Sequence, residues 1–526
     1  MRDINNKYVT YLNVIVMIYV VVASLYSVLR HYMYLSSGYD LGIFMQSLWT
    51  TAERMGLLFN TGEWQDIGTY SHFGVHNSPV LLILVPIYKV LPYAETLLII
   101  QPIALGFGAV MLFKFARFVL DDRKAFYIAV MYIVNPFIHG INRFDFHPVS
   151  LAVPFIFLIP YYYEKKEHAK LFLVSLVILS VKEDAGLILI SLGLMFILRR
   201  HKFTDLLRIK NWKHIVKNDP YSALLALMGF LWILFSLLVI IPHYNGGEYP
   251  YLSDGKLKRY GSRIYISNVI VYFTVAILST GFLSILNVNT FLASLPLWFE
   301  LLPSTKPEML ILGYQYPYML IPMLFILSVY NLKDVKSFRL NIGFSTNNRE
   351  KRYNFEITLK KIVAMTIVVT LIFSPMFHVV DVSPYVRGKS FYELGALYRE
   401  WGPYFNVLDN IVMQLSETDC IVTTQNMVFP HLANRVHTYY IVTPFESVYV
   451  PNGSVVLVVR SLPDYNITME YFHNYTALHN VSYTLLDANA IMLSCYNKTG
   501  DNYTKFINCI DNKVETVIHQ CSGDMR

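Results

Sequence analysis

The chain has 526 residues, of which 55% are hydrophobic, 15% aromatic and 15% charged, and its mean hydropathy is +0.41. Soluble domains carry about 25% charged residues, so this composition excludes a soluble globular protein and predicts a polytopic membrane protein. The net charge of +7 requires no nucleic-acid partner, because the basic residues are concentrated in a few loops between apolar segments.

Apolar segments of span length recur along residues 1–379, and the first is residues 9–29. That segment is too long for the apolar region of a signal peptide and has no clear small-residue cleavage site, so we expect a membrane span. Residues 79–91 are apolar but too few to cross a bilayer, which favours an interfacial or re-entrant segment. Eleven spans are predicted, at residues 9–29, 95–112, 125–140, 148–163, 169–181, 185–198, 221–241, 266–285, 288–303, 313–331 and 362–378.

A long loop, residues 30–78, follows the first span. Apolar residues recur in it at helical spacing, which predicts an amphipathic helix lying at the membrane surface. These residues are Leu41, Phe44, Met45, Leu48 and Trp49.

Basic residues mark one side of the membrane. Loop 199–217 holds seven Lys or Arg, loop 333–361 holds eight, and with eleven spans the basic loops all fall on the same side. Cytoplasmic loops carry an excess of Lys and Arg. We therefore expect a multi-pass protein of the cell membrane, with its N-terminus cytoplasmic and its C-terminal domain extracellular.

The composition changes near residue 380, and residues 380–526 have the pattern of a soluble domain. Residues 407–417 are predicted to form an amphipathic helix. Residues 420–424, 454–459 and 481–486 are predicted strands, with 491–495 as a fourth candidate. Helix and strands together predict a small extracytoplasmic α/β domain.

Cysteines and usable Asn-x-Ser/Thr sequons occur only in these last 147 residues. The cysteines are Cys420, Cys495, Cys509 and Cys521, which allow three pairings. The sequon asparagines are Asn452, Asn466, Asn474, Asn480, Asn497 and Asn502. Both features fit an oxidising compartment and a glycosylated surface, although a set of Ser-, Thr- and Asn-rich loops is the simpler alternative.

Four polar clusters are expected at the outer membrane surface. A charge at bilayer depth costs about 2.5 kcal/mol or more, so such groups are candidates for a functional site. The alternative is an ordinary solvated loop for the first-loop residues, a solvated turn for the triplet, and a side chain merely satisfied at the interface for His147. The clusters are Asp40, the pair His72 and His76, the run that contains Arg143, Asp145 and His147, and the triplet Lys182, Glu183 and Asp184.

Two chemistries suit these residue types. Asp, His and Glu could ligate a divalent metal that keeps open positions. Alternatively, one carboxylate acts as a general base while Lys182 and Arg143 hold a phosphate group. The sequence has no zinc-protease, Walker A, dinucleotide-binding or serine-hydrolase motif in a supporting position.

The sequence also resembles a known family at these residues. The run from Tyr39 to Phe44, with Gln46 and Trp49, is similar to the opening signature of the prokaryotic predicted-membrane-protein family DUF 2079. Further blocks resemble that family in order and spacing. They are His76 with Pro79 and residues 86–88, residues 145–148, residues 182–184, and residues 430–435 in the soluble tail.

In layout, DUF 2079 resembles the GT-C glycosyltransferases, multi-span enzymes that use polyprenyl-phosphate-linked sugars. The resemblance implies that Asp40 corresponds to the catalytic acidic residue of the first external loop. It likewise implies that Lys182 contacts the lipid phosphate. Gln315 and Tyr316 stand where a His-Tyr pair is expected, so a role for that position stays open.

We therefore expect an α-helical polytopic membrane protein of about eleven spans with a GT-C-like layout and a C-terminal α/β domain. The leading function is sugar transfer from a polyprenyl-phosphate donor at the outer face. A transporter or flippase, and a structural component of the cell envelope, remain the alternatives. Asp40 is the expected catalytic residue, and the expected substrate-binding residues are Lys182, Arg143, His76, Asp145, His147, Glu183 and Asp184.

Overall fold

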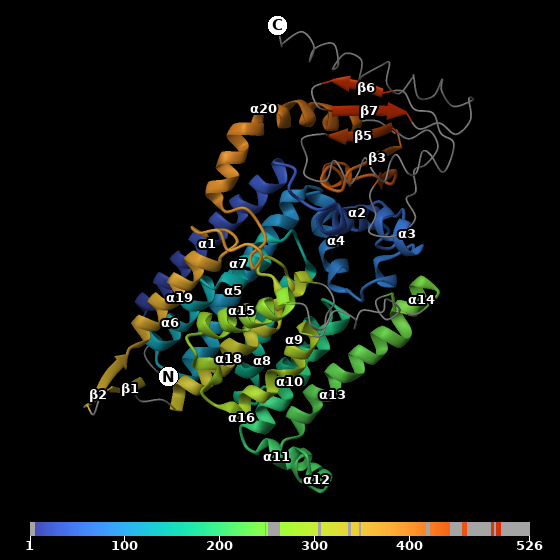
Figure 1. Ribbon diagram of the computed structural model, residues 1–526. Helices are drawn as coiled ribbons and strands as arrows, with labels where there is room; N and C mark the ends of the chain where they lie inside the picture. Colours follow the sequence, from blue (N-terminus) through green and yellow to red (C-terminus); the bar gives the residue numbers. More distant parts are fainter. Residues whose placement is uncertain are drawn as a thin grey trace.

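The structure is a computed structural model. It describes residues 6–247, 249–250, 263–302, 307–334, 338–346, 349–416, 421–441, 455–459, 485–488 and 491–495. Long helices form most of the molecule, and a mixed β-sheet lies at one end of them (Figure 1).

The helices follow the predicted apolar segments along the chain. The helices are α1 Asn6–Tyr32, α2 Ile43–Ala52, α3 Thr61–Ile67, α4 Val80–Val90, α5 Ala94–Val119, α6 Asp122–Ile133, α7 Pro136–Arg143, α8 Val153–Glu164, α9 His168–Leu179, α10 Gly186–Leu198, α11 Phe203–Leu206, α12 Ile209–Asn218, α13 Pro220–Phe235, α14 Ile241–Asn245, α15 Arg263–Ser279, α16 Val288–Phe291, α17 Leu295–Leu301, α18 Leu320–Asp334, α19 Leu359–Phe373 and α20 Phe391–Ser416. Prolines begin α7 and α13, where their fixed φ suits the first turn of a helix, whereas α4, α5 and α8 each continue through an internal proline.

Within the described residues, three helical segments are long and apolar enough to cross a membrane. They are Lys7–Tyr32, Ala94–Val119 and Pro220–Asn245. Helices α6 and α7, which meet at a bend of 43°, make a fourth if the pair counts as one span. The bend occurs where Asn135 caps α7 and Pro136 begins it. The remaining apolar helices are shorter than the roughly 20 residues of a straight span, so the count of eleven stays a prediction.

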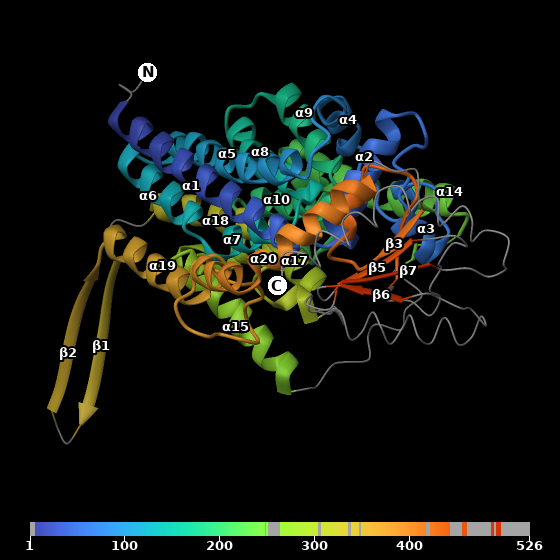
Figure 2. The same ribbon diagram turned by 90° about the horizontal axis from the view of Figure 1, so that it is seen from above.

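The predicted basic loops lie at the end of the molecule that also holds the N-terminus (Figure 1). Loop 199–217 contains α11 and α12. Loop 333–361 is not irregular, because β1 Phe338–Thr346 and β2 Arg349–Ile357 form an antiparallel hairpin in it. Figure 2 shows this hairpin projecting away from the helices. The sheet of the C-terminal region lies at the opposite end, as the charge pattern predicts. Which end faces the cytoplasm stays a prediction.

The C-terminal region contains a five-stranded sheet with the order β4-β3-β5-β7-β6. Strand β3 is parallel to β4 and β5, whereas β7 is antiparallel to β5 and β6. The strands are β3 Val422–Thr424, β4 Thr438–Tyr440, β5 Val455–Val459, β6 Leu485–Ala488 and β7 Ile491–Cys495.

Two details of this region differ from the sequence prediction. The predicted helix 407–417 is the end of α20, which begins at Phe391, and β4 was not predicted at all. The domain boundary at residues 379 and 380 stays a prediction. The six sequon asparagines and Cys420, Cys509 and Cys521 lie outside the described residues, and Cys495 ends β7. Glycosylation and disulfide pairing therefore also stay predictions.

The prediction of an interfacial amphipathic helix at residues 41–49 differs from the structure. Helix α2 occupies this position, but it is buried nearly all round instead of lying on a membrane surface. Its apolar residues pack in a cluster with α4 and with Phe429 and Tyr440 of the C-terminal region. Its polar residue Gln46 is also covered, because the amide donates to the carbonyl of Arg435 at 2.8 Å. A contact 389 positions away could not be read from helical spacing.

Candidate active site

Asp40 lies on a single π-helical turn, Gly38–Gly42, that leads directly into α2. The two flanking glycines allow the C-terminal region to approach this turn closely. A Cβ atom at Gly38 would collide with the Tyr440 ring, and one at Gly42 would lie 2.5 Å from Cδ1 of Phe429. Gly42 of the predicted signature and the preceding Gly38 therefore make room for aromatic residues that are distant in sequence.

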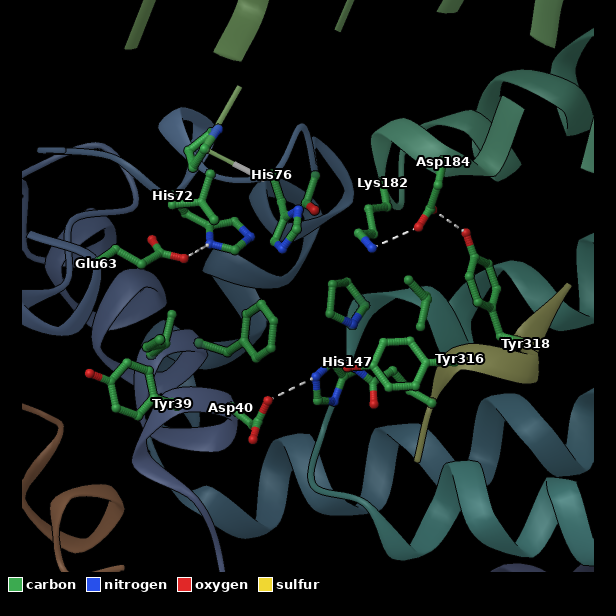
Figure 3. A pocket seen from close by; sticks show the side chains of 18 of the residues that line it. Tyr39, Asp40, Glu63, His72, His76, His147, Lys182, Asp184, Tyr316 and Tyr318 are labelled. Atoms are coloured by element: carbon green, nitrogen blue, oxygen red, sulfur yellow. Dashed lines mark hydrogen bonds and ion pairs between the residues drawn. The ribbon is translucent and has the colours of Figure 1, made fainter. Parts of the chain in front are cut away.

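His147 holds the Asp40 carboxylate. Its Nε2 lies 3.2 Å from Asp40 Oδ1, and its Nδ1 lies 2.9 Å from the carbonyl oxygen of Asp145 (Figure 3). A carbonyl oxygen can only accept, so Nδ1 carries a proton. The 3.2 Å contact between Nε2 and Oδ1 is an ion pair when the ring is protonated. The backbone N–H of His147 donates to Gln101 Oε1 at 2.9 Å, which anchors the histidine to α5.

Glu63 and His72 form a second carboxylate–imidazole pair. His72 Nδ1 lies 2.7 Å from Glu63 Oε1, and Asn60 Nδ2 donates to the other carboxylate oxygen at 2.7 Å. Burial raises the pKa of Glu63, but the contacts with His72 and Asn60 outweigh it, and the net shift is downward. His72 Nε2 is buried and has no hydrogen-bond partner among the described residues.

Glu183 and His76 form a third pair, in which His76 Nδ1 lies 2.8 Å from Glu183 Oε1. Glu183 also accepts the backbone N–H of Asn77 at 3.1 Å and the hydroxyl of Tyr249 at 3.0 Å. Burial raises the pKa of Glu183, yet His76 and Lys182 lower it further, so this carboxyl is ionised at neutral pH.

Lys182 begins the turn between α9 and α10. Its Nζ donates to Asp184 Oδ2 at 2.6 Å, and Tyr318 donates its hydroxyl to Asp184 Oδ1 at 2.6 Å. Burial lowers the pKa of Lys182, but Asp184 and Glu183 raise it more, so the ammonium stays charged. An ammonium has three N–H donors, so the bond to Asp184 leaves two more for a ligand.

These side chains surround one cavity of about 790 Å³. Figure 3 shows that they reach it from the first loop, from the segment before α8, from the α9–α10 turn and from the segment before α18. Its ionisable or hydroxyl-bearing lining residues are Tyr39, Asp40, Glu63, Asp66, His72, His76, Ser78, His147, Lys182, Asp184, Tyr249, Glu300, Tyr316 and Tyr318.

The structure thus brings together most of the predicted site residues. Asp40, His76, His147, Lys182 and Asp184 line the cavity. Glu183 does not line it and instead holds His76 from behind. His72, which the sequence placed in a polar cluster without a separate role, lines it as well.

Asp145 and Arg143 do not line the cavity. Asp145 is buried, pairs with Arg30 at 3.2 Å, and accepts the backbone N–H of Ser37 at 2.6 Å. Arg143 packs against Gly388 and points its guanidinium toward the carbonyl of Gly313. Asp145 therefore fixes the segment before the Asp40 turn, and the binding roles expected of Asp145 and Arg143 stay predictions.

Several lining residues were missed by the sequence reading. Glu63 follows Asn60 by three positions, the spacing of a helix cap, and Asn60 does cap α3. That pattern locates the helix start but gives no sign of a partner for His72. Gln315 and Tyr316, which depart from the expected pair, both line the cavity. Position 315 therefore lies at the site, although its side chain is Gln instead of the expected His.

A metal site is not supported by the described residues, where no three His, Cys, Asp or Glu side chains are grouped as metal ligands. The carboxylates and imidazoles face one another in pairs instead. Such pairs suit hydrogen bonding and proton transfer, which is the second of the two chemistries that the sequence left open.

The segment of residues 430–435 docks the C-terminal region on the first loop. His431 stacks between His31 and Tyr34, with ring centroids 4.0 Å apart in both contacts. Asn434 accepts the Tyr88 hydroxyl at 2.8 Å and donates to the carbonyl of Pro92. This block of the family resemblance is therefore an interface next to the site.

Two comparisons with known proteins agree with this picture. The chain is similar to the crystal structure of ArnT from Cupriavidus metallidurans bound to undecaprenyl phosphate, with a TM-score of 0.52 and 10% identity over 94% of this chain and 99% of that one. No curated protein matches the sequence. The model of the predicted membrane protein family DUF2079 matches residues 30–457. The resemblance to DUF 2079 and to a GT-C layout is thereby confirmed, and the chain belongs to the DUF2079 family of membrane proteins.

Proposed function

We propose that this protein is a membrane glycosyltransferase that moves a sugar from a polyprenyl-phosphate donor to an acceptor hydroxyl at the outer face of the cell membrane. One observation carries the proposal. Asp40 and Lys182, 142 positions apart in the sequence, line a single cavity in a fold that resembles ArnT. The ArnT structure contains undecaprenyl phosphate, which is a lipid phosphate of the donor class.

The chemistry needs few protein groups. The bond between the anomeric carbon and the phosphate oxygen breaks, and the polyprenyl phosphate leaves with the electron pair. A phosphate is a good leaving group, so a carboxylic acid that protonates it, as in most glycosidases, is not required. Lys182 would stabilise the negative charge that remains on the phosphate.

Asp40 would act on the acceptor. Its carboxylate accepts the proton of the attacking hydroxyl while the new bond forms between that oxygen and the anomeric carbon. His147 would keep the carboxylate oriented, since its own ring is fixed by the Asp145 carbonyl. Asp40 is partly exposed to the cavity, so a ligand there can reach it.

The placement of the reaction at the outer face of the membrane rests on the charge pattern of the loops and on the C-terminal tail. Helices α2 and α3, which contribute cavity-lining residues, lie toward the end of the molecule away from α11, α12 and the β1–β2 hairpin, whose sequences are rich in Lys and Arg (Figure 1). With those segments cytoplasmic, the cavity and the C-terminal region face outward. The sequons and cysteines of the tail would then be glycosylated and disulfide-bonded.

The proposal is tested by Asp40→Asn, which keeps the shape of the side chain but removes the base. Loss of a general base lowers rates by about 10²- to 10⁴-fold. Sugar transfer from polyprenyl-phosphate donors is measured with purified protein of equal yield and thermal stability. Asp121→Asn is the matched control, because Asp121 caps α6 outside the cavity and Asn caps equally well.

An Asp40→Asn variant as active as wild type would remove Asp40 from the mechanism. A wild-type protein that binds no polyprenyl phosphate would refute the proposal as a whole. Binding of the sugar-linked lipid and its movement across vesicles, without transfer to any acceptor, would instead favour the flippase alternative.

A further inference from the structure

His72 presents one unused nitrogen to the cavity. The side chain is about 2% exposed, lines the cavity, and has Nε2 without a partner among the described residues. Buried polar atoms are nearly always hydrogen-bonded, and each exception needs an explanation. A ligand that occupies the cavity would supply the missing partner.

The contacts of Glu63 determine whether His72 Nε2 donates or accepts a hydrogen bond. Asn60 Nδ2 donates to Glu63 Oε2, and the downward pKa shift keeps the carboxyl ionised. Glu63 Oε1 can then only accept, so the neutral imidazole carries its proton on Nδ1. Nε2 of the neutral ring therefore has a lone pair that points into the cavity as a hydrogen-bond acceptor.

An aromatic ring lies between His72 and the Asp40 pair. The Phe44 ring is 5.4 Å from the His72 ring and 5.5 Å from the His147 ring, with both contacts edge to face. Polar acceptors thus flank an apolar surface within one cavity. A ligand that carries both hydroxyl groups and C–H faces, as sugars do, fits this alternation.

The charged residues around the cavity further restrict the type of ligand that can bind there. Figure 3 shows Glu63 and Asp40 on the His72 side of the cavity and Asp184 beside Lys182 on the other side. Asp66 accepts the hydroxyl of Tyr39, which also lies on the His72 side. Among its described lining residues, Lys182 is the single Lys or Arg. An anionic group is therefore repelled near His72 and is accommodated only toward Lys182.

We propose that His72 Nε2 accepts a hydrogen bond from a hydroxyl group of the transferred sugar, so that the cavity selects a neutral, hydroxyl-bearing sugar, and that Glu63 is the positioning residue that sets the required tautomer. This inference rests on the proposed function and adds the group that recognises the sugar. The hydrogen bond is present both before and after sugar transfer, so its loss should lower the affinity of the protein for the donor.

Glu63→Gln reverses the polarity of His72 with little change in shape. The Gln carbonyl would take the place of Oε2 to accept from Asn60, which turns the amide NH₂ toward His72 Nδ1. Nδ1 must then accept, so the proton moves to Nε2. The variant presents a donor where the wild type presents an acceptor.

The first measurement needs no substrate. ¹⁵N NMR of the purified full-length protein carrying ¹⁵N-labelled histidine distinguishes a protonated ring nitrogen from an unprotonated one, and the signals missing from His72→Phe assign His72. His72 Nε2 should give the chemical shift of an unprotonated nitrogen in the wild type and that of a protonated nitrogen in Glu63→Gln. His139 is the internal control, because its Nε2 donates to the carbonyl oxygen of Ile133 at 2.8 Å and should stay protonated in both proteins.

The second measurement distinguishes recognition of the sugar from recognition of the lipid phosphate. Native mass spectrometry gives the affinities for undecaprenyl phosphate and for a panel of pentose- and hexose-linked undecaprenyl phosphates. His72→Phe should weaken the binding of the tightest sugar-linked lipid about three- to tenfold, the loss of one hydrogen bond, while affinity for undecaprenyl phosphate stays unchanged. Glu63→Gln should weaken it less, because a sugar hydroxyl can turn to accept from the Nε2–H of that variant. His72→Gln, which restores a carbonyl acceptor, should recover part of the loss.

His168→Phe is the matched control, since His168 stacks on Tyr221 outside the cavity, and it should leave both affinities unchanged. The same protonation of His72 Nε2 in wild type and Glu63→Gln would overturn the tautomer assignment. Equal weakening of sugar-linked and sugar-free lipid by His72→Phe, or no weakening at all, would overturn sugar recognition. If no lipid of the panel binds the wild type, the proposed function fails, and with it the identity of the ligand.

Discussion

The backbone N–H of Tyr39 donates to the side-chain oxygen of Asn426 at 3.1 Å, although 387 positions separate the two residues. Gly38 donates its N–H to the backbone carbonyl of the same asparagine at 2.9 Å. Tyr440 stacks on Tyr39 with ring centroids 4.7 Å apart. The C-terminal region therefore fixes the turn that carries Asp40, and in this way it contributes to the structure of the site.

Asn426→Ala should loosen this turn. The substitution removes the bond to Tyr39, and the Asp40 carboxylate loses part of its fixed orientation, which lowers kcat about tenfold while KM for the donor changes little. Hydrogen–deuterium exchange should become faster at residues 37–42. Asn434→Ala is the control, because Asn434 joins the same two regions through Tyr88 and Pro92 without touching the turn. Equal exchange at residues 37–42 in both variants would contradict the assignment.

Asp145→Ala should affect stability more than ligand binding. Arg30 and Asp145 are both buried, and removing the carboxylate leaves the guanidinium charge without its ionic partner. Breaking a buried ion pair in this way costs about 3–5 kcal/mol. A double-mutant cycle with Arg30→Met, followed by thermal unfolding in detergent, measures the coupling. A variant with normal stability but lost affinity for sugar-linked lipid would restore Asp145 as a binding residue.

Lys182→Ala should weaken the binding of undecaprenyl phosphate by about tenfold, equivalent to about 1.4 kcal/mol, because a charge-assisted hydrogen bond to phosphate is lost. The measurement is native mass spectrometry or a fluorescence titration with the sugar-free lipid. Lys89→Ala serves as the control, since Lys89 donates to the carbonyl of Ala52 and does not line the cavity. Unchanged affinity in Lys182→Ala would place the phosphate elsewhere.

Asp66 should make stability depend on pH. Burial raises its pKa from 3.8 to about 7, and the bond from the Tyr39 hydroxyl at 2.9 Å offsets only part of that shift. Between these two pH values the folded protein binds a proton that the unfolded chain does not bind. Stability therefore falls as pH rises from about 4 to 7, and the penalty is complete above about 7.

Asp66→Asn removes that penalty, and its amide oxygen can still accept from Tyr39. The variant should be more stable than wild type at pH 8 by about 1 kcal/mol, after allowance for water in the cavity, and nearly equal to it at pH 4. Melting temperatures of the two proteins at both pH values provide the test. A stabilisation of equal size at pH 4 and pH 8 would show that ionisation of Asp66 is not its cause.

Topology can be read from single introduced cysteines. Lys210 in α12 and Tyr392 in α20 are both exposed. The two helices lie toward opposite ends of the molecule (Figure 1). In intact cells, an impermeant maleimide should label Tyr392→Cys and spare Lys210→Cys, with peptide mass spectrometry reading each site. Permeabilised cells should show labelling of both. Labelling of Lys210→Cys alone in intact cells would invert the orientation.

The sequence by itself determined the membrane class, because hydropathy and charge act locally along the chain. It also located the helices approximately, and it indicated that Asp40, His147 and Lys182 belong to one site. Those residues stand out because polar groups beside apolar segments need partners, a requirement that is visible in one dimension. The family model matches residues 30–457, a range that contains these residues.

Only the tertiary structure decided which polar residues reach the cavity. Asp145 and His147 are two positions apart, yet one is paired with Arg30 and the other faces Asp40. Helix α2 has the spacing of a surface helix but is covered by the C-terminal region, as the bond from Gln46 to Arg435 shows. Periodicity records which faces of a segment are apolar, whereas burial and pairing depend on the distant segment that packs against each face, and that information arises only when the chain is folded.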